Sequence, residues 1–409
     1  MAEQEVSGRG DDLPPPGRIA EVFLAFLRLG LTSFGGPIAH LGYFRSELAL
    51  RRRWIDEGSY ASLVALCQFL PGPASSQVGF SLGVLRGGGL LGGLAAWCGF
   101  TLPSAAILLL FALGSTTFEG PAAAGILHGL KLVAVAVVAQ AVLGMARTLT
   151  PDLRRAAIAL LAVFVVTLAA GAAGQLVAIA LGALLGAVLC REPPARASAH
   201  LIFPVRRGAG IVSLALFAVL LVAPALVDLV YRDQALALFN AFYRSGALVF
   251  GGGHVVLPLL QAQVVAPGWT DSQTFLSGYG AAQAVPGPLF TLAAYLGAVV
   301  RPWPNGVAGA LIALVGVFLP GLLLVYGMLP FWDRIRRDPI AQATMRGANA
   351  AVVGVLGAAL YDPVWLGAVF SPLDAALALA GFLLLTVWKA PAWAVVAALA
   401  LAGLAGVLV

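Results

Sequence analysis

Charged residues are scarce in this sequence. Only 10% of the 409 residues are Asp, Glu, Lys or Arg, whereas 60% are hydrophobic. Soluble domains carry roughly 25% charged residues, which keep their surfaces hydrated. The composition therefore excludes an ordinary soluble protein and predicts an all-α polytopic membrane protein.

Motifs for several kinds of chemistry are absent as well. The sequence contains no Walker motif, no nucleophile elbow and no His/Cys cluster with metal-ligand spacing. The three cysteines, Cys67, Cys98 and Cys190, are scattered in apolar surroundings, where we expect them to pack as small apolar side chains. Asp228, near the end of an apolar run, is the one carboxylate we assign to a span. We therefore expect no enzyme, cofactor or metal, and energy coupling from an ion gradient, the membrane potential or a partner.

The charges that are present are mainly arginines. Lys and Arg number 24 against 18 Asp and Glu, and 22 of the 24 are Arg. In a membrane protein such a surplus indicates cytoplasmic loops rather than nucleic-acid binding. Residues 1–18 are polar and lack the apolar core of a cleaved signal, so we expect a disordered tail there.

Two Pro-Gly-Pro motifs interrupt apolar segments. The first lies in the stretch Gln68-Phe-Leu-Pro-Gly-Pro-Ala-Ser-Ser-Gln77 and the second in Gln283-Ala-Val-Pro-Gly-Pro288. Proline lacks an N–H and fixes φ, so neither helix can continue through its motif. At membrane depth such a break requires protein or a water-filled cavity to satisfy the freed backbone groups. Paired breaks of this kind are typical of transporters built from repeats.

The order of motifs in the first half returns in the second. Arg28, Gly35 and Gly36 lie 216 positions before Arg244, Gly251 and Gly252, and the Pro-Gly-Pro motifs lie 215 apart. Pro103 and Pro320 are 217 apart, and Pro121 and Pro339 are 218 apart. This slow drift predicts structural duplicates. The predicted divisions are a tail at 1–18, a first repeat at 19–190, a linker with an inverting span at 191–233 and a second repeat at 234–409.

The arginine clusters predict the orientation of the two halves. They fall at 51–53, 147–155, 191–207 and 334–337, and all should face the cytoplasm. All four clusters can face the cytoplasm if the two broken segments of each repeat are re-entrant. A re-entrant path is expected because half-segments of about 11 to 15 residues are too short to cross a ~30 Å core. About four spanning helices then follow in each half, in an inverted-topology repeat. The alternative, with fully crossing segments, gives thirteen spans and places 51–53 outside.

The breaks supply candidate groups for binding an anion. A helix that resumes near Ala74 leaves N–H groups without intrahelical partners, with the hydroxyls of Ser75 and Ser76 beside them, and such a terminus suits an oxyanion. Thr32 and Ser33 precede the double glycine Gly35-Gly36 in the same way. The structural alternative is that proline and glycine only kink packed helices.

Side chains near the breaks add further candidates. Arg28 and Arg244 lie inside apolar segments, where a guanidinium is costly and its fork suits a tetrahedral dianion, unless it extends to the interface. His40 and His254 are candidates for proton relay or for packing, and Gln68 and Gln283 for substrate binding or backbone capping. Lys131, with Arg346 near the opposite position, is a second basic candidate. Asp56 and Asp271 are expected to be helix N-caps rather than ligands.

These motifs carry a family resemblance. The Phe34-Gly-Gly-Pro-Ile-Ala-His40 stretch, the Gln68–Pro73 stretch and their second-half counterparts resemble the chromate transporter family. The resemblance extends from about Phe23 to the final span and fits the long-chain, two-domain members. The family positions carried onto this chain are Arg28, Gly35, Gly36, His40, Gln68, Pro71, Gly72, Pro73, Arg244, Gly251, Gly252, His254, Gln283, Pro286, Gly287 and Pro288.

The resemblance implies a multi-pass protein of the bacterial inner membrane. Such a protein exports chromate and confers resistance, driven by the proton gradient or the membrane potential, with chromate and the lipid bilayer as partners and a homodimer as a candidate assembly. A sulfate or other oxyanion permease is the alternative, and a membrane reductase or a passive channel is less favoured. Gly253 and Leu289-Phe290 depart from the first-half pattern. The hydroxyl-bearing first half is therefore expected to make the direct contacts.

Overall fold

Short and long helices alternate in the computed structural model of this chain. The structure describes residues 19–115, 120–169, 172–191, 203–231, 233–250, 255–332 and 338–408, and within these ranges every regular element is helical. This confirms the predicted all-α membrane-protein class. The predicted tail at 1–18 and the candidates Gly251, Gly252 and His254 lie outside the described residues.

The first half begins with short helices that end at the predicted breaks. Gly35, with φ of 98°, separates the first two helices, and Pro73 is the N-cap of a helix that starts at Ala74, as predicted. Longer helices follow. In order, the elements are α1 (Ile19–Thr32), α2 (Gly36–Phe44), η1 (Arg45–Arg51), α3 (Glu57–Phe69), α4 (Ala74–Arg86), α5 (Leu90–Ser115), α6 (Pro121–Leu149), α7 (Leu153–Leu168) and α8 (Ala172–Leu189).

The second half has the same order of short and long helices. The linking helix α9 (Arg207–Tyr231) precedes it. After the second Pro-Gly-Pro the chain makes a 3₁₀ turn before the α-helix resumes, unlike the first half. The elements are α10 (Gln234–Ala247), α11 (Val256–Val264), α12 (Ser272–Ala284), η3 (Leu289–Thr291), α13 (Leu292–Val299), α14 (Gly306–Met328), η4 (Leu329–Phe331), α16 (Pro339–Ala359), η5 (Leu360–Trp365), α17 (Pro372–Thr386) and α18 (Ala392–Leu408).

Two aspartates start corresponding helices in the two halves. Asp56 accepts a hydrogen bond from the Ser59 N–H at 2.9 Å, and Asp271 accepts one from the Thr274 N–H at 2.8 Å. Each carboxylate thereby satisfies one of the free N–H groups of a first turn. The prediction that both residues are N-caps is confirmed.

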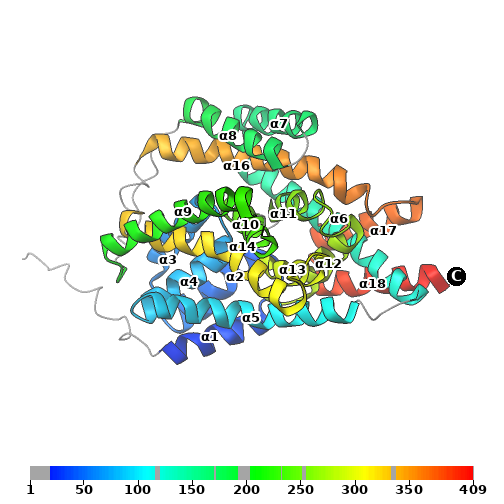
Figure 1. Ribbon diagram of the computed structural model, residues 1–409, viewed down its shortest axis with the longest axis horizontal. Helices are drawn as coiled ribbons and strands as arrows, with labels where there is room; N and C mark the ends of the chain where they lie inside the picture. Colours follow the sequence, from blue (N-terminus) through cyan, green and yellow to red (C-terminus); the bar gives the residue numbers. More distant parts are fainter. Residues whose placement is uncertain are drawn as a thin grey trace, which may run out of the picture.

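Helices of one half pack against helices of the other. In Figure 1, α7 and α8 lie with α16 along one side of the molecule, while α1 and α5 form the opposite side. Glycines allow the close approach: a Cβ at Gly347 would lie 2.1 Å from the Gly182 carbonyl oxygen, and one at Gly129 would lie 2.2 Å from that of Leu399. Gly129 and Gly347 occupy corresponding positions. In both halves the second long helix, α6 or α16, therefore packs against the last two helices of the other half.

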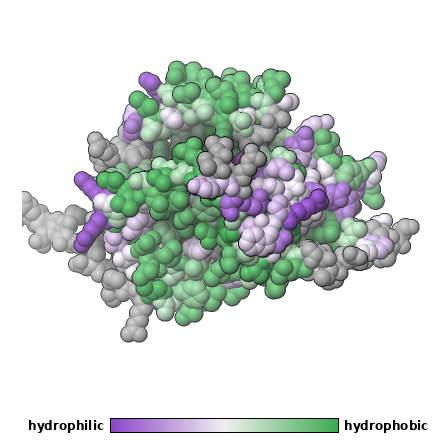
Figure 2. All heavy atoms as spheres, in the orientation of Figure 1, coloured by the Kyte–Doolittle hydropathy of each residue, from purple (hydrophilic) through white to green (hydrophobic). Residues whose placement is uncertain are grey.

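The outer surface is strongly apolar. Within the part of the chain that the structure describes, five helices are long and apolar enough to cross a bilayer, namely α5, α6, α9, α14 and α16, and α8, α17 and α18 are shorter apolar helices. Large apolar side chains such as Leu91, Leu110 and Val212 are about two-thirds exposed, at 65%, 69% and 67%. Figure 2 shows apolar residues over most of the face in view. Such a surface is suited to lipid, so the chain is a multi-pass membrane protein.

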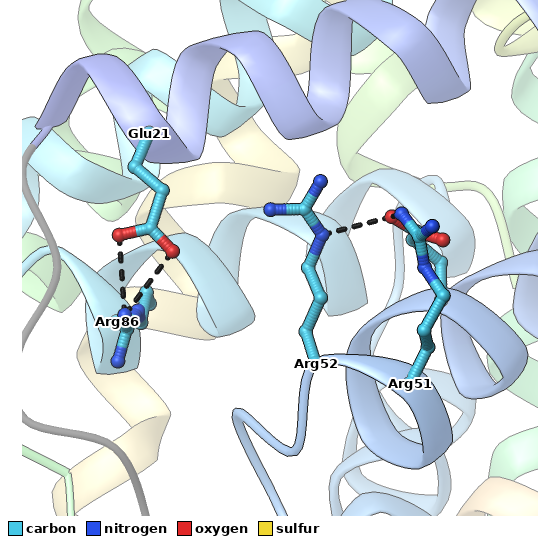
Figure 3. Close-up of polar contacts among 5 residues, drawn as sticks. Glu21, Arg51, Arg52 and Arg86 are labelled. Atoms are coloured by element: carbon cyan, nitrogen blue, oxygen red, sulfur yellow. Dashed lines mark hydrogen bonds and ion pairs between the residues drawn. The ribbon is translucent and has the colours of Figure 1, made fainter.

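Arginines near the ends of the first short helices have carboxylate partners. Arg86 on α4 donates to both oxygens of Glu21 on α1 at 3.1 Å, and Arg52 donates to Glu47 at 2.8 Å (Figure 3). Arg51 also pairs with Glu47. The Arg86–Glu21 pair connects α4 to α1, whereas Arg51 and Arg52 share the Glu47 carboxylate within η1 and at its C-terminal end.

Candidate functional site

The first Pro-Gly-Pro turn, Pro71-Gly72-Pro73, docks onto the second half of the chain. Gly72 has φ of 121°, and its N–H donates to the Val249 carbonyl at 2.7 Å. Val249 follows the end of α10, just before the second-half glycine break. A Cβ at Gly72 would lie 3.0 Å from the Cα of Gly321 on α14. Only glycine combines this backbone conformation with so close an approach.

Gln77, one turn into α4, fixes the same contact. Its side-chain N–H₂ donates to the Pro71 carbonyl at 2.9 Å and to the Gly321 carbonyl at 3.0 Å. The residue is fully buried. One amide thus ties a carbonyl in the broken turn to a carbonyl of α14 next to Pro320.

The second Pro-Gly-Pro turn, Pro286-Gly287-Pro288, docks onto the first half. The Gly287 N–H donates to the Ser33 carbonyl at 2.9 Å, and Gly287 has φ of 99°. A Cβ at this position would lie 2.8 Å from the Ser104 hydroxyl and 3.2 Å from the Phe100 carbonyl oxygen on α5. The Pro288 carbonyl accepts from the Thr291 N–H at 3.0 Å, which closes the 3₁₀ turn, and also from the Thr291 hydroxyl at 2.7 Å.

The two dockings correspond residue by residue. Ser33 and Val249 are 216 positions apart and both accept from a turn glycine, while Ser104 and Gly321 are 217 apart and both lie against a turn glycine. Each turn therefore holds together the broken helix and the proline-containing long helix of the other half. A shift of either half relative to the other would have to change both contacts.

Polar groups without partners gather at the second docking. The Ser33 hydroxyl is buried and has no hydrogen-bond partner, and the His40 ring is also buried. The His40 ring meets the Phe100 ring edge-on at 5.2 Å and lies beside the Ser33 backbone. Thr101, next to Phe100, also has a buried hydroxyl without a partner. Unsatisfied buried donors are costly, and they are suited to binding a polar guest.

The start of α4 offers a second group of donors. Ser75 and Ser76 are 3% and 2% exposed, and the Ser76 hydroxyl has no partner. The side chain of the N-cap residue, Pro73, makes no capping hydrogen bond. The positive end of the α4 dipole therefore lies in the protein interior with a free hydroxyl beside it.

Several predicted residues lie outside these buried contacts. The side chains of Arg28, Thr32 and Gln68 are exposed, and the Thr32 hydroxyl donates to the Arg28 carbonyl at 2.8 Å. Arg244 is half-buried. Gln283 is also half-buried; its amide nitrogen has no partner, while the side chain is hydrogen bonded to Tyr279. The structure thus brings together the backbone breaks, Ser33 and His40, but not Arg28 or Gln68.

Sequence reasoning missed residues on the long helices and beside the breaks. Gln77, Thr101, Ser104 and Gly321 all contribute to or adjoin the dockings. The spacing of Pro103 and Pro320 placed the long helices in correspondence, and that was the available signal for Ser104 and Gly321. No local pattern identifies Gln77, since its second partner lies 244 positions away. The assignment of a single carboxylate, Asp228, to a span also overlooked Asp374 in the first turn of α17.

Comparison with known proteins gives a consistent result. The family described as chromate transporter matches residues 20–187 and 236–406. A "Chromate transport protein" of Pseudomonas aeruginosa is 33% identical over 97% of this chain and 94% of its own length. A "Probable chromate transport protein" of Synechococcus elongatus is 30% identical over 82% of both chains, and a "Chromate transport protein" of Cupriavidus metallidurans is 25% identical over 85% of this chain and 82% of its own length. No solved structure is significantly similar. The chain therefore belongs to the chromate transporter family.

Proposed function

We propose that this protein is a secondary transporter that exports chromate across the bacterial inner membrane and thereby confers chromate resistance. The proton gradient or the membrane potential drives the export. The relatives named as chromate transport proteins support the choice of substrate. The reciprocal docking of the two Pro-Gly-Pro turns, with unpartnered polar groups beside it, is the observation that carries the proposal.

The chemistry of these groups suits a tetrahedral dianion. The hydroxyls of Ser33, Ser76 and Thr101 have donor capacity that the protein does not use. His40 adds ring nitrogens, one of which donates in the neutral form. Together with the N-terminal end of α4, they provide donors with dipoles oriented toward an anion, without a buried positive charge that would hold the anion too tightly.

The two halves contribute unequally to this site in our proposal. Thr101 in the first half corresponds to Phe318 in the second, and Ser75-Ser76 correspond to Phe290-Thr291. The Phe318 ring packs against Phe290 and Trp97 at 5.8 and 5.6 Å. Aromatic rings thus occupy the second-half positions of Thr101 and Ser75, and the Thr291 hydroxyl, at the position of Ser76, already donates to the Pro288 carbonyl. Donors from the first half then bind the substrate, and the second half supplies an apolar wall.

The inverted repeat provides the movement in this proposal. Each turn contacts the other half, so rocking one half against the other would alter both dockings together and open the site to alternate sides. The predicted divisions at 19–190 and 234–409, with α9 between them as the inverting span, are part of the same proposal.

Radiolabelled chromate flux in everted membrane vesicles tests the proposal. Accumulation inside the vesicles, abolished by an uncoupler, is the expected result. Accumulation that an uncoupler leaves unchanged would reject gradient-driven export, and no accumulation above vesicles without the protein would reject transport. Unlabelled sulfate is added as a competitor, and competition at lower concentration than unlabelled chromate would reassign the protein as a sulfate permease.

A further inference from the structure

A cluster of ionisable side chains, with Lys131 and Asp374 buried and His128 half-buried, joins α6 of the first half to α17 of the second. His128 Nε2 on α6 lies 2.7 Å from an Asp374 carboxylate oxygen, Oδ1, on α17. Lys131, one turn further along α6, is 6% exposed and interacts electrostatically with Asp374. We propose that Asp374 and His128 form a proton-binding site that couples proton movement to transport, an inference that rests on the proposed function.

The local structure leaves one carboxylate oxygen of Asp374 unused by the helix. Ser371 is the N-cap of α17, and its hydroxyl accepts from the Asp374 N–H at 3.1 Å. Asp374 Oδ2 in turn accepts from the Phe370 N–H at 3.0 Å. This arrangement is a variant of the capping box, and it needs only one carboxylate oxygen. Oδ1 is therefore available to His128, so helix capping alone does not explain the pair.

Phe370 shields the group on one side. The His128 ring stacks on the Phe370 ring with centroids 5.9 Å apart, and Lys131 Nζ lies 5.5 Å from the same ring. Asp374 is only 8% exposed. An ionisable cluster within membrane helices is costly to keep unless it has a function, and low solvent access strengthens the interactions between its members.

Few other charges face this group. On α12, which packs against α6, the N-cap Asp271 interacts with Lys131 and lies 3.7 Å from Arg301. η5, which packs against α6, contains Tyr361 and Asp362, and both side chains are exposed. α18 contains no ionisable residue. On α16 the charged residue is Arg346, which donates to the Cys190 carbonyl at 3.0 Å. Among these described groups, His128 is the one imidazole, and the Asp374 carboxylate is its ion-pair partner.

The corresponding positions of the other half carry different chemistry. With the offset of 218 between Pro121 and Pro339, His128 corresponds to Arg346 and Lys131 to Asn349. The N-caps Asp152 and Ser371 are 219 apart, so Asp374 corresponds to Arg155. Arginine does not release its proton in proteins, whereas a carboxylate–imidazole pair can. Proton binding is therefore a property of the α6–α17 contact, and the corresponding contact of α16 with α7 lacks it.

The pair is placed to link protonation to helix movement. A proton taken from water onto the Asp374 carboxylate removes the negative charge that holds His128 and Lys131 from the facing helix. Release of the same proton restores the attraction. Because α6 and α17 belong to different halves, the charge state of Asp374 changes the strength of a contact between halves, which is what coupling requires.

Infrared titration of the purified protein tests proton binding directly. Wild type should show a protonated-carboxyl stretch that titrates with pH, and Asp374→Asn should lose it while its amide oxygen keeps the helix cap. Asp233→Asn, at the exposed N-cap of α10, is the matched control and should leave the band intact. His128→Gln should shift the pH at which the band titrates. A band unchanged in both Asp374→Asn and His128→Gln would overturn the site.

Proteoliposomes with an internal pH dye test the coupling. Wild type should move protons when a chromate gradient is imposed, and Asp374→Asn should lose this proton movement while retaining chromate exchange between equal concentrations. Proton movement equal to wild type in Asp374→Asn would overturn the coupling site alone. Absence of chromate exchange in wild type would instead reject the proposed function and, with it, the coupling role.

Discussion

Gly72 and Gly287 are the residues on which the contact between the halves depends most directly. Both have positive φ, and both lie against a helix of the other half. We predict that Gly72→Ala and Gly287→Ala lower the thermal stability of the detergent-solubilised protein and abolish chromate flux. A left-handed conformation costs an L-residue about 1–2 kcal/mol, and the added Cβ must in addition displace Gly321 or Ser104.

Gly120→Ala is a control that separates the cost of the backbone conformation from the cost of displacing a neighbouring helix. Its φ is 114°, and a Cβ there would meet nothing within 4 Å. Gly120→Ala should therefore show the conformational cost alone and retain flux. Equal losses of stability and flux in all three variants would mean that the dockings add nothing beyond local backbone strain.

Gln77 makes a second residue-scale contribution through its side chain. Gln77→Ala removes two buried hydrogen bonds, to the carbonyls of Pro71 and Gly321, each of which contributes roughly 0.5–1.5 kcal/mol net. We predict a lower melting temperature, and a larger decrease for Gln77→Glu, whose carboxylate faces both carbonyls. The control is Gln68→Ala, because Gln68 is exposed. A melting temperature for Gln77→Ala equal to that of the control would contradict this role.

At the scale of elements, the ends of the interrupted helices carry buried hydroxyls that make no hydrogen bond within the protein. Ser76 in the first turn of α4 and Ser33 after α1 both have free, buried Oγ atoms. We predict that Ser33→Ala and Ser76→Ala leave thermal stability unchanged but raise the chromate KM. A hydrogen bond to a charged group contributes about 1.5–3 kcal/mol, which corresponds to roughly ten- to hundred-fold in affinity.

Ser62→Ala is a matched control for these variants. Ser62 on α3 also has a buried hydroxyl without a partner, but it lies outside both dockings. Its replacement should change neither stability nor KM. A chromate KM unaffected in Ser33→Ala and Ser76→Ala would remove these hydroxyls from the site.

The positions of the breaks and the starts of the helices were predictable because their causes are local. Proline at 71 and 73 ends one helix and precedes the next whatever surrounds it, and Asp56 caps its own helix. The same reasoning does not reach contacts whose cause is distant in the sequence. The offset of 215 showed that the two turns correspond, but not that each binds the opposite half. Arg28 was chosen for its charge in an apolar segment, yet its side chain is exposed, since helix rotation is decided by packing.

At the scale of the whole molecule, the reciprocal contacts suit two halves of opposite orientation in the membrane. α9 joins them, and it has a candidate span of its own at Arg207–Pro224. One additional span between two similar halves reverses the second relative to the first. The arginine-rich stretch at 51–53 and the Gln263–Ser272 stretch, which contains no Lys or Arg, would then face opposite sides.

Single cysteines at corresponding positions test this orientation. Gly58 and Gln273 are 215 apart, and both are exposed near the starts of α3 and α12. In a background with Cys67, Cys98 and Cys190 replaced by alanine, we predict that a membrane-impermeant maleimide labels Gln273→Cys in intact cells and Gly58→Cys only after the membrane is opened. The re-entrant form of the first half puts Gly58 on the cytoplasmic side, together with Arg154, so Arg154→Cys should behave like Gly58→Cys.

If Gly58→Cys were labelled in intact cells and Gln273→Cys were not, the segments before α5 would cross the membrane fully. Labelling of both from the same side would exclude opposed halves, and with them the rocking movement on which export depends in our proposal.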